Sequence, residues 1–202
     1  MRGIEMQTIV YDCEILKAVP SQFSYCEKGI KYCSGWSDHA RMGISVIGVY
    51  DYAEDRYHVF CEDNKAEFEA LCRSRDLFVG FNSIPFDNAL ISATSGWFCP
   101  PEEKCYDLLR ETWIAAGLEP TFSRKTHGGF GLAAICETNF GKSKTGNGAL
   151  APVEWQRGKV GSVVNYCLND VWLTKRLFDA VLAGSAITNP KDQGKLTLRK
   201  PG

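Results

Sequence analysis

The sequence predicts an α/β domain in which a mixed β-sheet, an antiparallel meander plus parallel strands, is flanked by helices. Residues 8–16 are rich in β-branched and aromatic side chains and are apolar on both alternating faces, which is typical of a strand in the middle of a sheet. Between residues 8 and 81 the expected order is strand, strand, strand, helix, strand, which favours a mixed sheet over a sandwich or a helical bundle. With 202 residues, 45% of them apolar, the chain can bury the core of one domain.

The first half of the chain contains most of the expected sheet. The expected strands are residues 8–16, 41–51, 56–60 and 77–81. Residues 17–40 show no clean period and are expected to form an irregular excursion between the first two strands. Asn64 is a suitable cap for a helix that runs through Phe68 and Leu71.

The second half is expected to be mainly helical. Pro85 suits the first turn of a helix that Ser83 or Asn82 caps, which places Asp87 in the same turn. The further expected elements are a loop at residues 96–105, a short strand or helix at 106–109 that continues towards Trp113, a helix at 132–140 and a helix from about residue 160 to 182.

Composition indicates a soluble, cytoplasmic protein of one domain. We expect residues 1–183 to form the domain and residues 184–202 to be a basic tail that is either disordered or lies across it. No apolar run has the length of a membrane span, and the N-terminus lacks the pattern of a signal peptide. The nine cysteines are an odd number without a CxxC pair, so they are expected to be reduced. The spacings of Cys26, Cys33 and His39 match no familiar zinc site.

Charge is unevenly distributed along the chain, although the formal net charge is only −1. Residues 1–109 carry 10 basic and 17 acidic side chains, whereas residues 110–202 carry 13 basic and 7 acidic ones. An acidic half that holds metal ions and a basic half that holds phosphates would produce this asymmetry. Chance placement of surface charge would produce it as well.

The basic loop at residues 141–148 is not a Walker A phosphate loop, because Cys136 stands where the first glycine is required. Its two lysines, Lys142 and Lys144, either contact a nucleic-acid backbone or are simply solvated.

Several carboxylates fall where apolar side chains are expected. Asp12 and Glu14 share one face of the buried first strand, and their repulsion is relieved either by a divalent cation or by a strand end that reaches water. Asp87 lies near backbone amides, where the helix dipole alone favours an acid. Tyr166 and Asp170 lie on the apolar arc of the last helix, where a buried hydrogen bond between them is the simplest explanation.

Together these residues resemble a known family. The sequence contains Asp12-x-Glu14 in a first strand, Asn82-x-x-x-Phe86-Asp87 at a strand-to-helix junction and Tyr166-x-x-x-Asp170 in a late helix. In this order and context they are similar to the three motifs of the DEDDy 3′-5′ exonucleases, which have the RNase H-like fold and include polymerase proofreading domains and ribonuclease D. The sister DEDDh group has histidine five residues before the last acid, where this chain has Asn165.

The resemblance implies a two-metal-ion 3′-5′ exonuclease that uses Mg²⁺ or Mn²⁺ and releases nucleoside 5′-monophosphates from the 3′ end of single-stranded DNA or RNA, with DNA favoured. The residues it implies as metal ligands are Asp12, Glu14, Asp87 and Asp170, with Tyr166 orienting the attacking water. Asn82 and Phe86 are implied to bind the terminal nucleotide. Apart from the resemblance, Lys142 and Lys144 of the basic loop remain candidates for contact with the nucleic-acid backbone.

One position departs from the family pattern, since many relatives have threonine where Ile15 follows the first glutamate. The size and the insertions rich in cysteine and tryptophan are similar to nucleases encoded by bacteriophages, which would place the protein in the host cytoplasm. No membrane contact is expected, and the sequence identifies no replication or recombination partner. The alternatives are an RNase H-like endonuclease and a catalytically silent module that binds nucleic acid.

Overall fold

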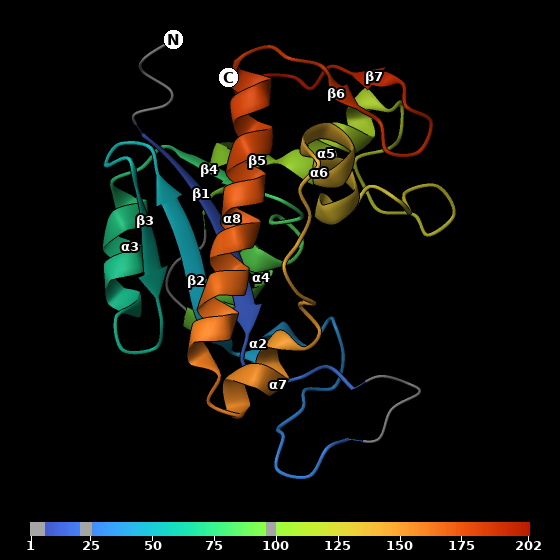
Figure 1. The fold of residues 1–202 in the computed structure, drawn as a ribbon. Helices are drawn as coiled ribbons and strands as arrows, with labels where there is room; N and C mark the ends of the chain where they lie inside the picture. The colour runs from blue at the N-terminus through green and yellow to red at the C-terminus, as the bar shows by residue number, and fades with distance from the viewer. Residues whose placement is uncertain (1–6, 21–25, 96–99) are drawn as a thin grey trace.

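The computed structural model describes residues 7–20, 26–95 and 100–202 (Figure 1). Its main sheet has five strands in the order β3-β2-β1-β4-β5. The strands are β1 (Thr8–Ile15), β2 (Ile44–Asp51), β3 (Arg56–Phe60), β4 (Leu77–Gly80) and β5 (Cys105–Asp107). Strands β1, β2 and β3 pair antiparallel, whereas β4 pairs parallel with both β1 and β5. The predicted mixed sheet, with a meander and parallel strands, is therefore confirmed.

Helices cover both faces of this sheet. The longest, α8 (Val160–Leu182), runs along one face and crosses β1 and β2 (Figure 1). The other helices are α2 (His39–Met42), α3 (Lys65–Arg73), α4 (Asp87–Ser95), α5 (Leu108–Ala115), α6 (Leu132–Phe140) and α7 (Ala151–Gln156), with one 3-10 turn at Glu102–Lys104. Helices α3 and α4 lie on the face opposite α8, so the sheet is buried on both sides.

Strand β1 lies at the centre of the sheet, and its side chains contribute to the hydrophobic cores on both faces. Val10 packs into the cluster beneath α8, together with Val171 and Phe178. Ile9 and Tyr11 point the other way, into the cluster that includes residues of α3 and α4. This alternation is the one that the sequence predicts, and it leaves Asp12 and Glu14 on the face that α8 covers.

The C-terminal segment is packed on the domain. It contains the short hairpin of β6 (Ile187–Thr188) and β7 (Lys195–Leu196). Ile187, Leu196 and Leu198 are buried in the same cluster as α8, and the Tyr106 hydroxyl donates a hydrogen bond to the Arg199 carbonyl. Of the two expected behaviours of this segment, the structure shows the one in which it lies across the domain. The division of the chain at residue 183 stays a prediction.

Some local predictions were wrong. Residues 41 and 42 end α2 instead of starting a strand, and β2 begins only at Ile44. Asn64 does not cap α3, because its side chain accepts from the Cys61 amide and donates to the Val59 carbonyl. Pro85 lies in a turn, and α4 begins only at Asp87. Helix α7, with a proline in its first turn, was not predicted.

The described cysteines are all free, as expected. Cys26, Cys33 and His39 do not bring three ligand atoms together, and the Cys33 thiol instead donates to the Ala18 carbonyl. Among the described residues, no helix is both long enough and apolar enough to cross a membrane.

Candidate active site

Strand β1 and helix α8 bring two of the predicted motifs together. Asp12 is half-buried and Glu14 buried beneath α8, where Asp170 is 2% exposed and Tyr166 is 8% exposed. A carboxylate oxygen from each β1 acid lies within 4.8 Å of the other and of the Cys167 thiol. Residues about 155 positions apart in the sequence therefore meet on one face of the sheet.

A glycine allows α8 to approach this closely. Gly48 in β2 pairs with Asp12 across the sheet. A Cβ atom on Gly48 would lie 2.9 Å from the Cys167 sulfur and 3.2 Å from a Val171 methyl group. Any larger residue would push the helix outward, and with it Asp170. Gly48 is thus a determinant of the site that the sequence motifs do not include.

The remaining motif, Asn82-x-x-x-Phe86-Asp87, joins the site through the backbone of β1. Asp87, buried at the start of α4, accepts a hydrogen bond of 2.9 Å from the Cys13 amide. The turn before it is held by Asp107, whose carboxylate accepts from the amides of Asn82 (2.9 Å) and Ile84 (3.1 Å). Asn82 adopts a left-handed conformation, with φ of 63°. Such a conformation is costly for most residues and is well tolerated by asparagine.

The acids of the three motifs line one pocket of about 370 Å³. Of the nine residues predicted to act in the site, eight line it: Asp12, Glu14, Asn82, Phe86, Asp87, Lys144, Tyr166 and Asp170. Lys142 is exposed and is not among the lining residues. Its predicted contact with the substrate backbone therefore has no support from the position of its side chain.

The carboxylates of the pocket destabilise one another's charged forms. Burial, and then the neighbouring Asp170, raise the pKa of Asp12 to about 7. Burial and the charge of Asp12 also raise the pKa of Glu14 and of Asp87 well above the usual range. The raised values mean that ionised carboxylates here need a positive partner.

Lys144 supplies one such charge. Its ammonium forms an ion pair with Asp170 and donates to the Tyr166 hydroxyl at 3.2 Å. Burial lowers the pKa of Lys144, but the carboxylates of Asp170 and Asp12 outweigh burial and raise it overall. Lys144 is the only lysine or arginine among the described residues that line the pocket. One ammonium cannot balance four carboxylates.

The donor set fits hard divalent cations. The Oδ1 atom of Asp170 is buried and makes no hydrogen bond within the described part of the chain. A buried carboxylate oxygen without a donor is unfavourable unless a cation completes it. Four carboxylates from three segments offer the oxygen ligands that Mg²⁺ and Mn²⁺ prefer. The residues able to hold such ions are Asp12, Glu14, Asp87 and Asp170.

Comparison with known proteins supports the predicted fold but does not test the roles of the site residues. No protein-family model matches the chain, and no curated protein sequence matches it. The fold is similar to part of the family B DNA polymerase from the hyperthermophilic archaeon Pyrobaculum calidifontis. The TM-score is 0.57 with 17% sequence identity, and the match covers 87% of this chain and 24% of the polymerase. The likeness is consistent with the predicted RNase H-like fold.

Sequence reasoning missed three residues of the site. Asp107 could have been found, because an aspartate directly before a helix is a common cap and its side chain indeed accepts from the Leu109 amide. Gly48 gives only a weak signal, as a glycine inside a predicted strand. Trp36, which also lines the pocket, gives none, since it lies in the irregular segment before α2.

Proposed function

We propose that the protein is a metal-dependent 3′-5′ exonuclease that hydrolyses single-stranded nucleic acid and releases nucleoside 5′-monophosphates. One observation carries the proposal: carboxylates from β1, α4 and α8 converge in one pocket whose lining offers a single ammonium group. The similarity of the fold to part of a DNA polymerase agrees with it. Polymerase proofreading domains belong to the family that the three sequence motifs resemble.

Two divalent cations held by these carboxylates would supply a reactive hydroxide and stabilise the charge that develops on the phosphate. Asp12 lies close to Glu14 and is electrostatically linked to both Asp87 and Asp170. By analogy with the family that the motifs resemble, we assign Asp12 as a ligand that would serve both ions. Asp12 and Glu14 come from the face of β1 that α8 covers, Asp170 comes from α8 itself, and Asp87 lies at the start of α4.

Tyr166 is suited to position the attacking water and not to deprotonate it. Burial, followed by the charge of Asp170, raises the pKa of the Tyr166 hydroxyl above its ordinary value. The hydroxyl therefore remains protonated at neutral pH and acts by hydrogen bonding. Its orientation is set by Lys144 and by the backbone at Gly148, where a Cβ atom would lie 3.2 Å from the hydroxyl oxygen.

Asn82 and Phe86 line the pocket from the turn that precedes α4. The left-handed backbone at Asn82 and the Asp107 hydrogen bonds fix the turn that presents both side chains. We assign the amide of Asn82 to a hydrogen bond with the terminal nucleotide and the ring of Phe86 to its base. Lys144 would contact a substrate phosphate once a cation takes over the charge of Asp170.

A cleavage assay tests this function. DNA and RNA oligonucleotides labelled at the 5′ or 3′ end, linear and circular, are incubated with the protein in Mg²⁺, Mn²⁺ or EDTA. We expect mononucleotides from the 3′ end of linear strands, intact circles and no product in EDTA. Cleavage of circles would instead identify an endonuclease. Binding without hydrolysis in every metal would identify a silent binding module, and hydrolysis in EDTA would refute the metal-dependent mechanism.

A further inference from the structure

An exposed tryptophan stands at the mouth of the carboxylate pocket. The Trp36 residue is 55% exposed and lines the same pocket as Asp12 and Asp170. A single exposed apolar side chain is ordinary on a protein surface, but an indole that joins the lining of a charged pocket offers a large flat face to whatever binds there. No predicted role includes it.

Trp36 belongs to an aromatic wall formed by Trp36, His39 and Phe86. The ring centroids of Trp36 and Phe86 are 6.1 Å apart at 55°, and those of His39 and Phe86 are 5.7 Å apart at 74°. Phe86 comes from the turn before α4, whereas the other two residues come from the segment before and within α2. Two separate segments therefore build one aromatic surface next to the acids.

The segment that carries Trp36 is held in place by its own hydrogen bonds. The Asp38 carboxylate accepts from the Ser34 amide at 2.8 Å, and the Asp38 amide donates to the Gly35 carbonyl at 3.0 Å. Just before this turn, the Cys33 amide donates to the Ala18 carbonyl at 3.0 Å, which ties the segment to the residues that follow β1. The indole is thus presented by a tight, anchored turn, so it needs little ordering when a ligand arrives.

Aromatic side chains near a phosphodiester-binding site stack on nucleobases without regard to sequence. A paired terminal base is held against its partner strand, whereas an unpaired terminal base can rotate to place its face on such a wall while its phosphate reaches the acids. The pocket volume of about 370 Å³ lies in the range of small-molecule sites, about 300–1,000 Å³.

We propose that Trp36 is a substrate-positioning residue that stacks, together with Phe86, on the base of an unpaired terminal nucleotide. This inference rests on the proposed function for the identity of the reacting strand. The inference gives the irregular segment between β1 and β2 a role. Through Trp36, this segment supplies a second stacking residue in addition to Phe86. It also predicts a preference for frayed or single-stranded ends over paired ones.

A thermodynamic cycle tests the contact directly. Binding of fluorescein-labelled oligo-dT is measured by anisotropy in Ca²⁺, with probe integrity checked on a gel, for probes that end in thymidine or in an abasic residue. Stacking of one base on an aromatic side chain is worth about 5- to 150-fold in affinity. We expect Trp36→Ala to weaken binding of the thymidine probe by about tenfold and to leave the abasic probe unchanged.

Controls separate stacking from folding. Trp36→Phe should recover most of the affinity, and Phe122→Ala should have no effect, because Phe122 is an equally exposed aromatic residue (61%) that packs on Trp113 outside the pocket. Equal losses for both probes, or no loss for either, would overturn the stacking role. If the proposed function is wrong, a different result is expected: the wild-type protein will bind these probes but cleave nothing in Mg²⁺ or Mn²⁺.

Discussion

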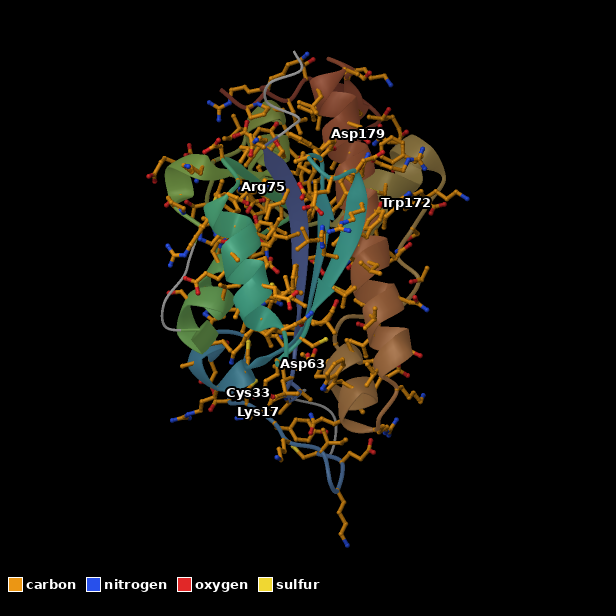
Figure 2. All side chains as sticks on the ribbon, turned by 90° about the vertical axis from the view of Figure 1, so that its left-hand side faces the viewer. Lys17, Cys33, Asp63, Arg75, Trp172 and Asp179 are labelled. Atoms are coloured by element: carbon orange, nitrogen blue, oxygen red, sulfur yellow. The ribbon has the colours of Figure 1, made fainter. Side chains whose placement is uncertain are left out.

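Two acidic clusters lie on the same sheet and differ in how their charge is balanced. In both, ligand atoms of three residues lie within 4.8 Å of one another: Asp12, Glu14 and Cys167 in the pocket, and Asp51, Glu54 and His58 at the β2–β3 hairpin. In Figure 2, Arg75, which pairs with Asp51 of the hairpin cluster, lies in the upper part of the molecule. Cys33, which precedes Trp36 in the sequence, lies in the lower part.

The hairpin cluster has its own cation. Arg75 donates from Nε (2.9 Å) and Nη2 (2.6 Å) to the two oxygens of Asp51, which is 0% exposed, and the Ala53 amide adds a third bond. Burial raises the pKa of Asp51, but the Arg75 and Ala53 hydrogen bonds outweigh burial and lower it overall. In the pocket, by contrast, the pKa values of the acids are raised. Both clusters therefore have the spacing of metal ligands. Only the cluster in the pocket, which we call the uncompensated cluster because its carboxylates lack enough positive partners, requires metal ions.

Replacing an acid of the uncompensated cluster should have the largest effect on activity. Asp12→Asn should lower kcat at least about 1,000-fold, because cation-based stabilisation of the transition state is worth several kcal/mol. In EDTA the same variant should melt no lower than the wild type, since the change removes a repulsive charge. Steady-state cleavage and thermal melting measure both effects. An active Asp12→Asn enzyme would place the reaction elsewhere.

Replacing the cation of the compensated cluster should affect stability instead. Arg75→Met leaves Asp51 buried without its partner, which costs about 3–5 kcal/mol of unfolding free energy. Cleavage per folded molecule should not change. Urea unfolding and active-fraction kinetics measure the two quantities. The double variant Asp51→Asn/Arg75→Met should regain part of the loss, and a fully additive result would show that the two side chains are not coupled.

Crowding the Tyr166 hydroxyl should have a moderate effect on kcat. Gly148→Ala places a Cβ atom 3.2 Å from the hydroxyl oxygen, so the hydroxyl must shift. We expect kcat to fall about tenfold with little change in KM, because small displacements of a positioning group are costly. Gly161→Ala is the matched control. It meets nothing within 4 Å and should stabilise α8 by about 0.5–1 kcal/mol without changing kcat. Equal kcat values for the two variants would show that Tyr166 is not oriented by this loop.

The smallest expected effect is on the pH dependence of stability without metal. The folded pKa of Asp12, about 7, lies above its unfolded value, so its contribution is full below about pH 4 and is lost as pH rises through 7. The lowered pKa of Asp51 acts in the opposite sense, and its contribution is lost only at acid pH. In EDTA the wild-type Tm should fall by roughly a few degrees between pH 5 and 8. Asp12→Asn should flatten this slope, and an unchanged slope would contradict the assignment.

Much of the fold was predictable because burial on two faces leaves a clear pattern. The alternation of β1, the apolar arc of α8 and the strand order along the chain all follow from periodicity. Local polar contacts were not predictable in the same way. Asn64 is a good cap by residue type, yet in the structure its side chain bonds to Cys61 and Val59 instead. Such competing bonds depend on tertiary neighbours.

For the site, sequence spacing identified which acids could meet but not what lies between them. Asp12, Asp87 and Asp170 do line one pocket, and their catalytic roles stay proposals. The substrate contact of Lys144 stays a proposal, and the sequence did not predict its ion pair with Asp170, which depends on how the loop folds. Trp36 had no motif or period to mark it. Its position follows only from the turn that Asp38 holds.

Isothermal titration with Mn²⁺ tests the central claim most directly. The uncompensated pocket should bind two ions per chain in the wild type, and Asp12→Asn should abolish at least one of them. Glu54→Gln, in the compensated hairpin cluster, should leave both intact. Absence of saturable binding to the wild type, or loss of binding in Glu54→Gln with retention in Asp12→Asn, would contradict the assignment of the carboxylate pocket as the metal centre.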